Sequence, residues 1–358
     1  MHCYVCENEI TKENETEEHI ILNAIGGKLK SKKLICVSCN SKFGSQIDDK
    51  LSNQLRPIAT MLNVKRDRGK PQNIKGKFGT RDIIMEPGGK MRLSRAYHEI
   101  DGNVFHIEAP SISGAKKVLL GLKRNYPQID IDKAMEEAES KSDKKFKATF
   151  DMNFGGIDIA RAYCKMAVNF FIHHGGSSKD IQHLLPFIEG KHEEAEVYYF
   201  YPKSEVFYKG KEEILHSIVL RGDKLRKQSY VFIELFNEFK MIVFLSRDYQ
   251  GEDIYESYHH NIVTNEFIDF ETQLVITPKV LKKSCSKELD EVKFLERMKY
   301  LFQQIHNVNV DRKKDEIIHT SIEELKQRFP HEEYYTAEMR NILFGRVLEK
   351  YFEVFQNE

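Results

Sequence analysis

The sequence predicts an α+β protein in which a small cysteine-bearing N-terminal module is followed by a larger mixed region and a helical C-terminus. Three observations predict this class. Two cysteine pairs lie within the first 39 residues. Strand-like runs separated by turn signals fill residues 196–246, and apolar residues spaced three or four apart recur from residue 286 onward. The length of 358 residues allows two or three domains.

The composition excludes several classes of protein. The 55 Lys and Arg residues balance 55 Asp and Glu residues, so the chain is neither a globally basic nucleic-acid coat nor an acidic tail protein. With 41% hydrophobic residues and 9 prolines, it is neither disordered nor collagen-like. No run approaches the roughly 20 apolar residues that cross a bilayer. The start at Met1–Cys3 lacks the features of an export signal, so we expect a cytoplasmic protein without a membrane segment.

Four consecutive regions are expected along the chain. Residues 1–60 hold the cysteine module, and residues 61–95 form a basic, glycine-containing connector. Residues 96–285 form an α+β domain of unknown role, and residues 286–358 form a helical region. Between Arg56 and Arg95, eleven basic residues outnumber three acidic ones, and five glycines together with Pro71 and Pro87 break regular structure. This stretch is therefore expected to be a loop or a short hairpin.

The region after the connector contains both kinds of element. We expect strands at 103–108 and 146–152 and helices at 115–124, 131–139 and 156–174. Four further runs, with turn signals at Gly222-Asp223 and Asn237-Glu238, predict an antiparallel meander: 196–201, 215–221, 229–236 and 240–246. C-terminal helices are expected to start at a Ser286 cap and at a Thr320–Glu323 capping box, and a third covers 338–355.

The two cysteine pairs predict a structural zinc site. Cys3-x-x-Cys6 and Cys36-x-x-Cys39 are closely spaced thiolate pairs on two turns, which can converge on one tetrahedral ion. The 29 residues between the pairs are more than a minimal zinc ribbon needs, so they are expected to hold a further element. Cys164, on an apolar helical face, and Cys285 are interpreted as incidental. The pairs His173-His174 and His259-His260 are interpreted as surface histidines.

The segment between and after the pairs reads TEEHIILNAIGGKLKSKKLIC and CNSKFGSQIDDKL. From Cys3 to about Leu55 the chain resembles the zinc-bearing branch of the HNH endonucleases, whose pattern is CxxC, EH, GG, CxxCN and FGxxxD. The resemblance implies a ββα-metal module. Its first strand would end in Glu18-His19, its loop would contain Gly26-Gly27, and its second strand would cover 33–36. Its helix would open near Asn40.

The resemblance also implies an activity and a set of roles. HNH enzymes hydrolyse phosphodiester bonds with one divalent cation, Mg²⁺ or Mn²⁺. By position in the motif, His19 would be the general base, Glu18 the acidic metal ligand and Asn40 the final metal ligand. The middle Asn of the motif is replaced near Ser31. Because adjacent residues on a regular strand face opposite sides, Glu17 is kept as the alternative ligand.

The predicted partner is DNA, held by a basic run that supplies sequence-independent phosphate contacts. Its residues are Arg56, Lys65, Arg66, Arg68 and Lys70. By analogy with other HNH fusions, the C-terminal region is expected to select the target or control activity, as in a prokaryotic restriction or anti-phage system. Two alternatives stay open: a non-catalytic zinc module that binds nucleic acid, and an RNA-cleaving nuclease. An activating ligand, a protein partner and self-association also stay open.

Overall fold

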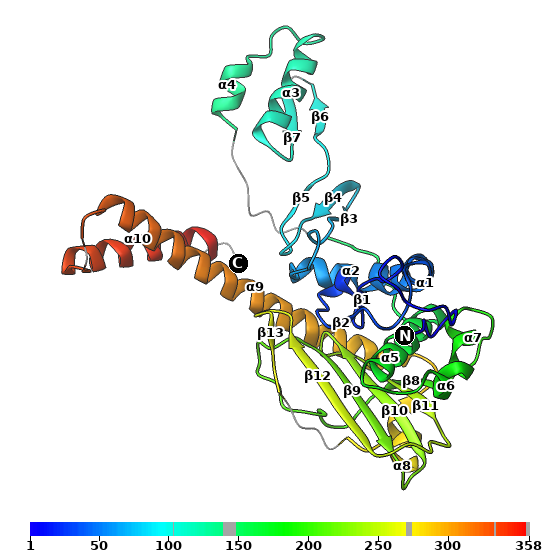
Figure 1. The fold of residues 1–358 in the computed structure, drawn as a ribbon. Coiled ribbons are helices and arrows are strands. Elements are labelled where there is room, and N and C mark those ends of the chain that lie inside the picture. Colours follow the sequence, from blue (N-terminus) through cyan, green and yellow to red (C-terminus); the bar gives the residue numbers. More distant parts are fainter. Residues whose placement is uncertain (103, 139–147, 270–273, 333, 356–358) are drawn as a thin grey trace. The chain divides into compact units, whose positions relative to one another are not determined.

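A computed structural model describes residues 1–102, 104–138, 148–269, 274–332 and 334–355. The chain forms two units, each assembled from two separate stretches (Figure 1). The first unit contains Met1–Gln72 and Met152–Ile305, and the second contains Asn73–Asp151 and His306–Glu358. This division differs from the four consecutive regions predicted. The chain leaves the first unit inside the expected connector and returns to it before the first long helix of the mixed region.

The N-terminal module is built around a very short hairpin. β1 (Glu18–His19) pairs antiparallel with β2 (Lys30–Ser31), and the 3₁₀-helix η1 (Asn23–Ile25) lies between them. Gly26 adopts φ +96°, and a Cβ on Gly27 would lie 1.9 Å from the carbonyl oxygen of Ile21. Only glycines therefore fit this turn. The second strand lies at 30–31, earlier than the predicted 33–36.

A nearly continuous helical segment follows the hairpin. It comprises α1 (Val37–Phe43), a π-helical turn η2 (Gly44–Asp48) and α2 (Asp49–Met61). The segment begins at the second cysteine pair, because Cys36 is the N-cap of α1. The buried residues Leu51, Leu55 and Ile58 give α2 one apolar face toward the core.

The rest of the first unit is organised on a seven-stranded antiparallel sheet (Figure 1). Its strand order is β13-β12-β9-β10-β11-β8-β14. The strands are β8 (Val197–Phe200), β9 (Leu215–Asp223), β10 (Gln228–Leu235), β11 (Phe239–Ser246), β12 (Ile254–Asn261), β13 (Glu266–Phe267) and β14 (Cys285–Ser286). The predicted meander is confirmed for β9, β10 and β11, which pair in sequence order. β12 was not predicted, because its sequence IYESYHHN lacks a clear apolar alternation.

Burial in this sheet contradicts the interpretation of His259-His260 as surface residues. Both lie on β12 and are at most 2% exposed. His216 on β9 is also fully buried, and its Nε2 lies 2.8 Å from the carbonyl oxygen of Ile25. Burial lowers the pKa of His216 to about 3. This imidazole is therefore neutral and joins the sheet to η1 of the N-terminal module.

Helix α5 (Ile157–His173) lies between the sheet and the N-terminal module (Figure 1). On the sheet side, the Tyr163 hydroxyl donates to the carbonyl of Phe239 at 2.9 Å. On the module side are Lys165 and Asn169, four residues apart and therefore on one helix face. The prediction of a helix over 156–174 is confirmed. Three short helical turns follow it: α6 (Ser178–Ile181), η3 (Gln182–Leu184) and α7 (Leu185–Ile188).

Lys165 is 1% exposed and forms the main polar link between α5 and the module. Its ammonium lies 2.6 Å from Glu18 Oε1 on β1 and 2.6 Å from Asp48 Oδ2 on η2. Burial lowers the pKa of Lys165, but the two carboxylates outweigh burial and raise it above its ordinary value. The amide of Asn169 donates to Glu18 Oε1 at 2.9 Å and accepts from the Tyr4 hydroxyl at 2.7 Å.

The second unit contains two small sheets and helices. β3 (Ile74–Phe78), β4 (Arg81–Met85) and β5 (Met91–Leu93) form an antiparallel sheet in the predicted connector, while β6 (Tyr97–Asp101) and β7 (Val104–Glu108) form a hairpin. Next come α3 (Ile112–Lys123) and α4 (Ile131–Glu136). The strand predicted at 146–152 lies partly outside the described residues. Its described part contributes a single bridge, between Thr149 and Lys77.

The C-terminal helices are α8 (Pro278–Ser284), α9 (Glu291–Arg328) and α10 (Ala337–Phe355). The predicted Ser286 cap is wrong, because Ser286 lies in β14 and Asp290 Oδ1 accepts from the Lys293 amide at the start of α9. The capping box at Thr320 is wrong too, because α9 runs through it and the Ser321 hydroxyl donates back to the Ile317 carbonyl. None of the described helices has both the length and the apolar character that crossing a membrane requires.

Lys165→Met is expected to destabilise the protein by about 3–5 kcal/mol, since it leaves the buried Glu18 and the half-buried Asp48 without their cation. Urea unfolding measures the change. The matched control is Lys179→Met at an exposed helix position, which should change stability by less than about 0.5 kcal/mol. Adding Glu18→Gln and Asp48→Asn to Lys165→Met should restore part of the stability. Equal midpoints for Lys165→Met and the control would contradict the role of the ion pairs.

Candidate functional site

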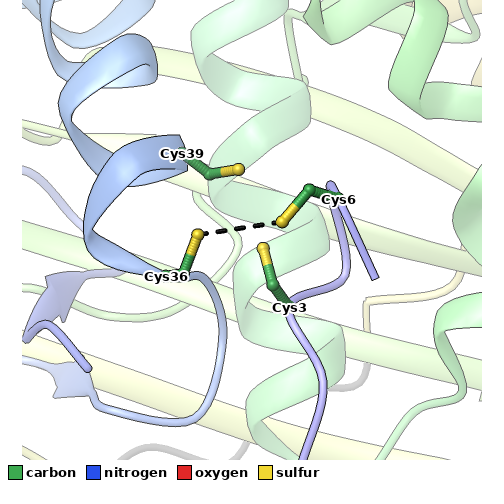
Figure 2. Close-up of side chains that lie close together, drawn as sticks. All are labelled: Cys3, Cys6, Cys36 and Cys39. Carbon is green, nitrogen blue, oxygen red and sulfur yellow. Dashed lines mark hydrogen bonds between the residues drawn. The ribbon is translucent and has the colours of Figure 1, made fainter. Parts of the chain in front are cut away.

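The four predicted zinc ligands meet in space. The Sγ atoms of Cys3, Cys6, Cys36 and Cys39 all lie within 4.8 Å of one another, and Figure 2 shows them pointing toward a common centre. The Sγ atoms of Cys6 and Cys36 are 3.8 Å apart. A tetrahedral zinc with Zn–S bonds of about 2.3 Å separates its sulfur ligands by about 3.8 Å. The donor set therefore fits a structural zinc ion.

The local backbone explains how the thiols converge. In the first knuckle, the Glu7 amide donates to the Cys3 carbonyl at 2.8 Å, and Glu7 adopts φ +60°, which closes a tight turn. In the second, Cys36 precedes the first turn of α1 and Cys39 lies within it. Burial raises the pKa of Cys36, but hydrogen bonds from the Cys39 amide and neighbouring thiols lower it to about 7. A thiolate is the form that binds zinc.

A second candidate site includes residues of the β1–β2 hairpin. It is a pocket of about 680 Å³ lined by Glu15, Thr16, Glu17, His19, Asn23, Lys30, Lys32, Asn40, Asp67 and Arg68. Two of the three predicted catalytic residues, His19 and Asn40, thus share one pocket. The alternative ligand Glu17 lines it as well. The pocket collects an imidazole, an amide and carboxylates beside several cations.

His19 contacts a residue that the motif did not indicate. Its Nε2 lies 3.2 Å from Asp67 Oδ2, across 48 residues of sequence. Asp67 also accepts from Lys28 at 2.8 Å, and Lys30 lies 3.4 Å away. The hydrogen bond from Lys28 holds the pKa of Asp67 well below its ordinary value. Asp67 was counted only as one of three acidic residues in a basic run, and no sequence spacing connects it to position 19.

The other polar groups of the pocket are paired with neighbours. The Asn40 amide nitrogen donates to Thr16 Oγ1 at 3.0 Å, so its carbonyl oxygen is the atom with lone pairs for a cation. Lys30 bonds Glu17 at 3.1 Å, and Lys32 bonds Glu15 at 2.9 Å. The hydrogen bond from Lys30 lowers the pKa of Glu17. Both rim carboxylates are thus held by lysine ammonium groups.

The third predicted catalytic residue, Glu18, is not in this pocket. Its side chain is 3% exposed and is bound by Lys165 and Asn169 on the opposite side of β1. The motif predicts that Glu18 and His19 share one site. In the structure, the Glu18 carboxylate and the His19 imidazole lie on opposite sides of β1, because neighbouring residues on a strand alternate in direction. Asp48, the aspartate of FGxxxD, also contacts Lys165. Burial raises the pKa of both carboxyl groups.

The five predicted DNA contacts do not form one uniform surface. Lys65, Arg68 and Lys70 are exposed, and Arg68 lines the pocket. Arg66 is half-buried and donates to the Lys70 carbonyl, and burial lowers its pKa. Arg56 is half-buried on α2 and bonds Asn53. Three of the five side chains are therefore exposed, and one of these three, Arg68, lines the pocket.

Wild-type protein is expected to contain about one zinc ion per chain, and Cys36→Ser is expected to lose most of it, because three thiolates bind zinc far more weakly than four. Elemental analysis and urea unfolding measure metal content and stability. Cys285→Ser, at a half-buried position far from the cluster in sequence, is the matched control and should retain the zinc. Full zinc content in Cys36→Ser would contradict the four-cysteine site.

Comparison with known proteins agrees with this geometry. Residues 3–56 match the family described as HNH endonuclease. No curated protein and no solved structure matches the chain. The matched segment contains both cysteine pairs, the β1–β2 hairpin and the start of α2, and it supplies most of the pocket lining. Residues 3–56 are therefore an HNH endonuclease domain.

Proposed function

We propose that the protein is a metal-dependent endonuclease that hydrolyses phosphodiester bonds in DNA. The observation that carries the proposal is the shared pocket of His19, Glu17 and Asn40 within the segment that matches the HNH endonuclease family. An imidazole can take a proton from water near neutral pH. Carboxylate and amide oxygens are the donors that hard divalent cations prefer. One pocket thus holds both groups that phosphodiester hydrolysis requires.

The residues fit a divalent cation such as Mg²⁺ or Mn²⁺. Glu17 and Asn40 would hold it, and Glu17 takes the part that the motif gives to Glu18, because Glu18 is already buried against Lys165. The Lys30 ammonium lies 3.1 Å from the Glu17 carboxylate, and a bound metal ion would displace it. When bound, the cation would stabilise negative charge on the phosphate and the leaving oxygen.

The protein's own groups account for the remaining steps. His19 would accept a proton from the attacking water, whose oxygen then bonds to phosphorus. Lys30, Lys32 and Arg68 would attract and orient the phosphate on the pocket rim, since cations there favour an anionic ligand. Lys65 and Lys70, beside Arg68, would extend these contacts along the nucleic-acid backbone.

The wider role is also part of the proposal. The family match ends at residue 56, so most of the chain is left to select the target or control cleavage, as in a prokaryotic restriction or anti-phage system. Four of the six cysteines form the candidate zinc cluster and none of the six is disulfide-bonded, which suits a reducing cytoplasm. An uncontrolled nuclease would damage the DNA of its own cell, so the C-terminal region is expected to restrain or direct it.

His19→Ala and Glu17→Gln are each expected to lower cleavage of plasmid DNA in Mg²⁺ or Mn²⁺ by about 10²-fold or more, because each removes a group from the reacting centre. Glu18→Gln is expected to lower the free energy of unfolding while cleavage by the folded fraction persists. Gel assays with purified protein, with EDTA as the metal-free arm, measure cleavage. Thermal unfolding and zinc content are measured on the same samples.

His2→Ala, at an exposed histidine just before the matched segment, is the matched control and should cut like wild type. Undiminished cutting by His19→Ala would contradict the role of the base. Loss of cutting in Glu18→Gln but not in Glu17→Gln would identify Glu18 rather than Glu17 as the metal ligand. Salt-sensitive DNA binding without cleavage would favour the non-catalytic zinc module, and cleavage restricted to an RNA substrate would favour the RNA-cleaving alternative.

Replacing Lys65, Arg68 and Lys70 with Gln is expected to weaken DNA binding and to reduce the slope of log K against log salt by up to about 2.7, which is three phosphate contacts at about 0.9 each. Fluorescence anisotropy on a DNA duplex at several salt concentrations measures the slope. The control replaces three exposed lysines elsewhere in the unit, Lys179, Lys224 and Lys227. Equal slopes for both triple variants would remove residues 65–70 from the interface.

A further inference from the structure

The contact between His19 and Asp67 joins the motif to a segment outside the matched domain. Asp67 follows α2 in the segment 62–72, which runs back beside the hairpin. Its Oδ2 lies 3.2 Å from His19 Nε2. A carboxylate only accepts hydrogen bonds, so the contact favours a proton on Nε2 and leaves Nδ1 as the basic nitrogen. One side chain would thus select the tautomer of the general base.

Asp67 is held in place independently of His19. Its backbone amide donates to Asn23 Oδ1 at 2.8 Å, so η1 fixes the main chain. Lys28 bonds Oδ1 at 2.8 Å and leaves Oδ2 directed at the imidazole, with Lys30 at 3.4 Å from Oδ2. Two lysines of the hairpin region therefore hold the carboxylate, and Asn23 holds the main chain. Because the Asp67 carboxylate is fixed by these contacts, it can set the orientation of the His19 imidazole.

The residue at the motif's own orienting position is engaged elsewhere. Ser31, where the middle Asn would fall, accepts from the Lys33 amide at 3.1 Å. Its partner across the hairpin is Glu18, while His19 stands opposite Lys30. Among the described residues that line the pocket, Asp67 is the carboxylate in contact with His19. Asp67 can therefore orient His19 in place of the middle Asn of the motif.

We infer that Asp67 is the positioning residue for His19, so that the catalytic centre includes the segment 62–72 beyond the matched domain. This inference rests on the proposed function. In the reaction, Nδ1 of His19 takes a proton from water, the water oxygen bonds to phosphorus, the bond from phosphorus to the leaving oxygen breaks, and the leaving oxygen takes a proton from solvent water. The Nε2 proton stays on the ring. Asp67 then faces the imidazolium and stabilises its charge.

The test compares Asp67→Ala, Asp67→Glu and the control Asp49→Ala, an exposed acidic residue on α2, in the full-length protein. Nitrogen NMR of histidine-labelled protein, with the His19 signal assigned from His19→Ala, reports the tautomer. We expect wild type and Asp49→Ala to carry the proton on Nε2 and Asp67→Ala to show a tautomer mixture. In plasmid cleavage, Asp67→Ala should lower kcat by about 10²–10⁴-fold with little change in KM, and Asp67→Glu should recover part of it.

A wild-type tautomer and wild-type kcat in Asp67→Ala would overturn the inference. So would an equal loss of activity in Asp49→Ala, because it would mean general damage rather than loss of a specific contact. The NMR arm does not need activity. If wild-type protein cuts no nucleic acid but the Asp67 variant alone changes the tautomer, the proposed function fails and the pairing of His19 with Asp67 stands.

Discussion

The buried ammonium of Lys165 is the constraint on which the architecture of the first unit depends. A charge removed from water must be neutralised nearby, and here the carboxylates of Glu18 and Asp48 do so at 2.6 Å each. These carboxylates come from β1 and from the helical segment that follows the second cysteine pair. One side chain of α5 therefore fixes the first strand of the HNH domain against its helix. The direction of β1 decides in turn which residues face the pocket.

The orientation of β1 directs the side chains of residues 17–19 to two different places, the core and the pocket. Glu18 turns inward and takes part in the folded core, whereas Glu17 and His19 line the pocket. A motif read as a string gives adjacent residues one role, but a strand assigns alternate residues to opposite faces. In the proposed function, the metal-binding carboxylate is therefore Glu17 rather than Glu18. The four-cysteine cluster links the N-terminal knuckle to the turn that precedes α1.

Sequence reasoning succeeded where the determinants are local. The CxxC spacing within each pair, helix α5 and the meander all depend on residues close in the chain. It failed where distant residues decide. One hydrogen-bond partner of Glu18, Asn169, is 151 residues away in the sequence, and Asp67, which contacts His19, is 48 residues away. Likewise, β12 is a strand because the sheet covers its histidines, not because its own pattern is apolar.

The discontinuity of the first unit has a consequence for the order of synthesis. A ribosome releases residues 1–72 well before it has made α5, so the nascent HNH segment emerges with Glu18 and Asp48 and without Lys165. Its zinc knuckles can close at that stage, since all four cysteines are present by residue 39. The strand that carries His19 gains its full support only after translation reaches residue 169. Until α5 has been made, the growing chain therefore lacks the buried contacts that support the His19 pocket.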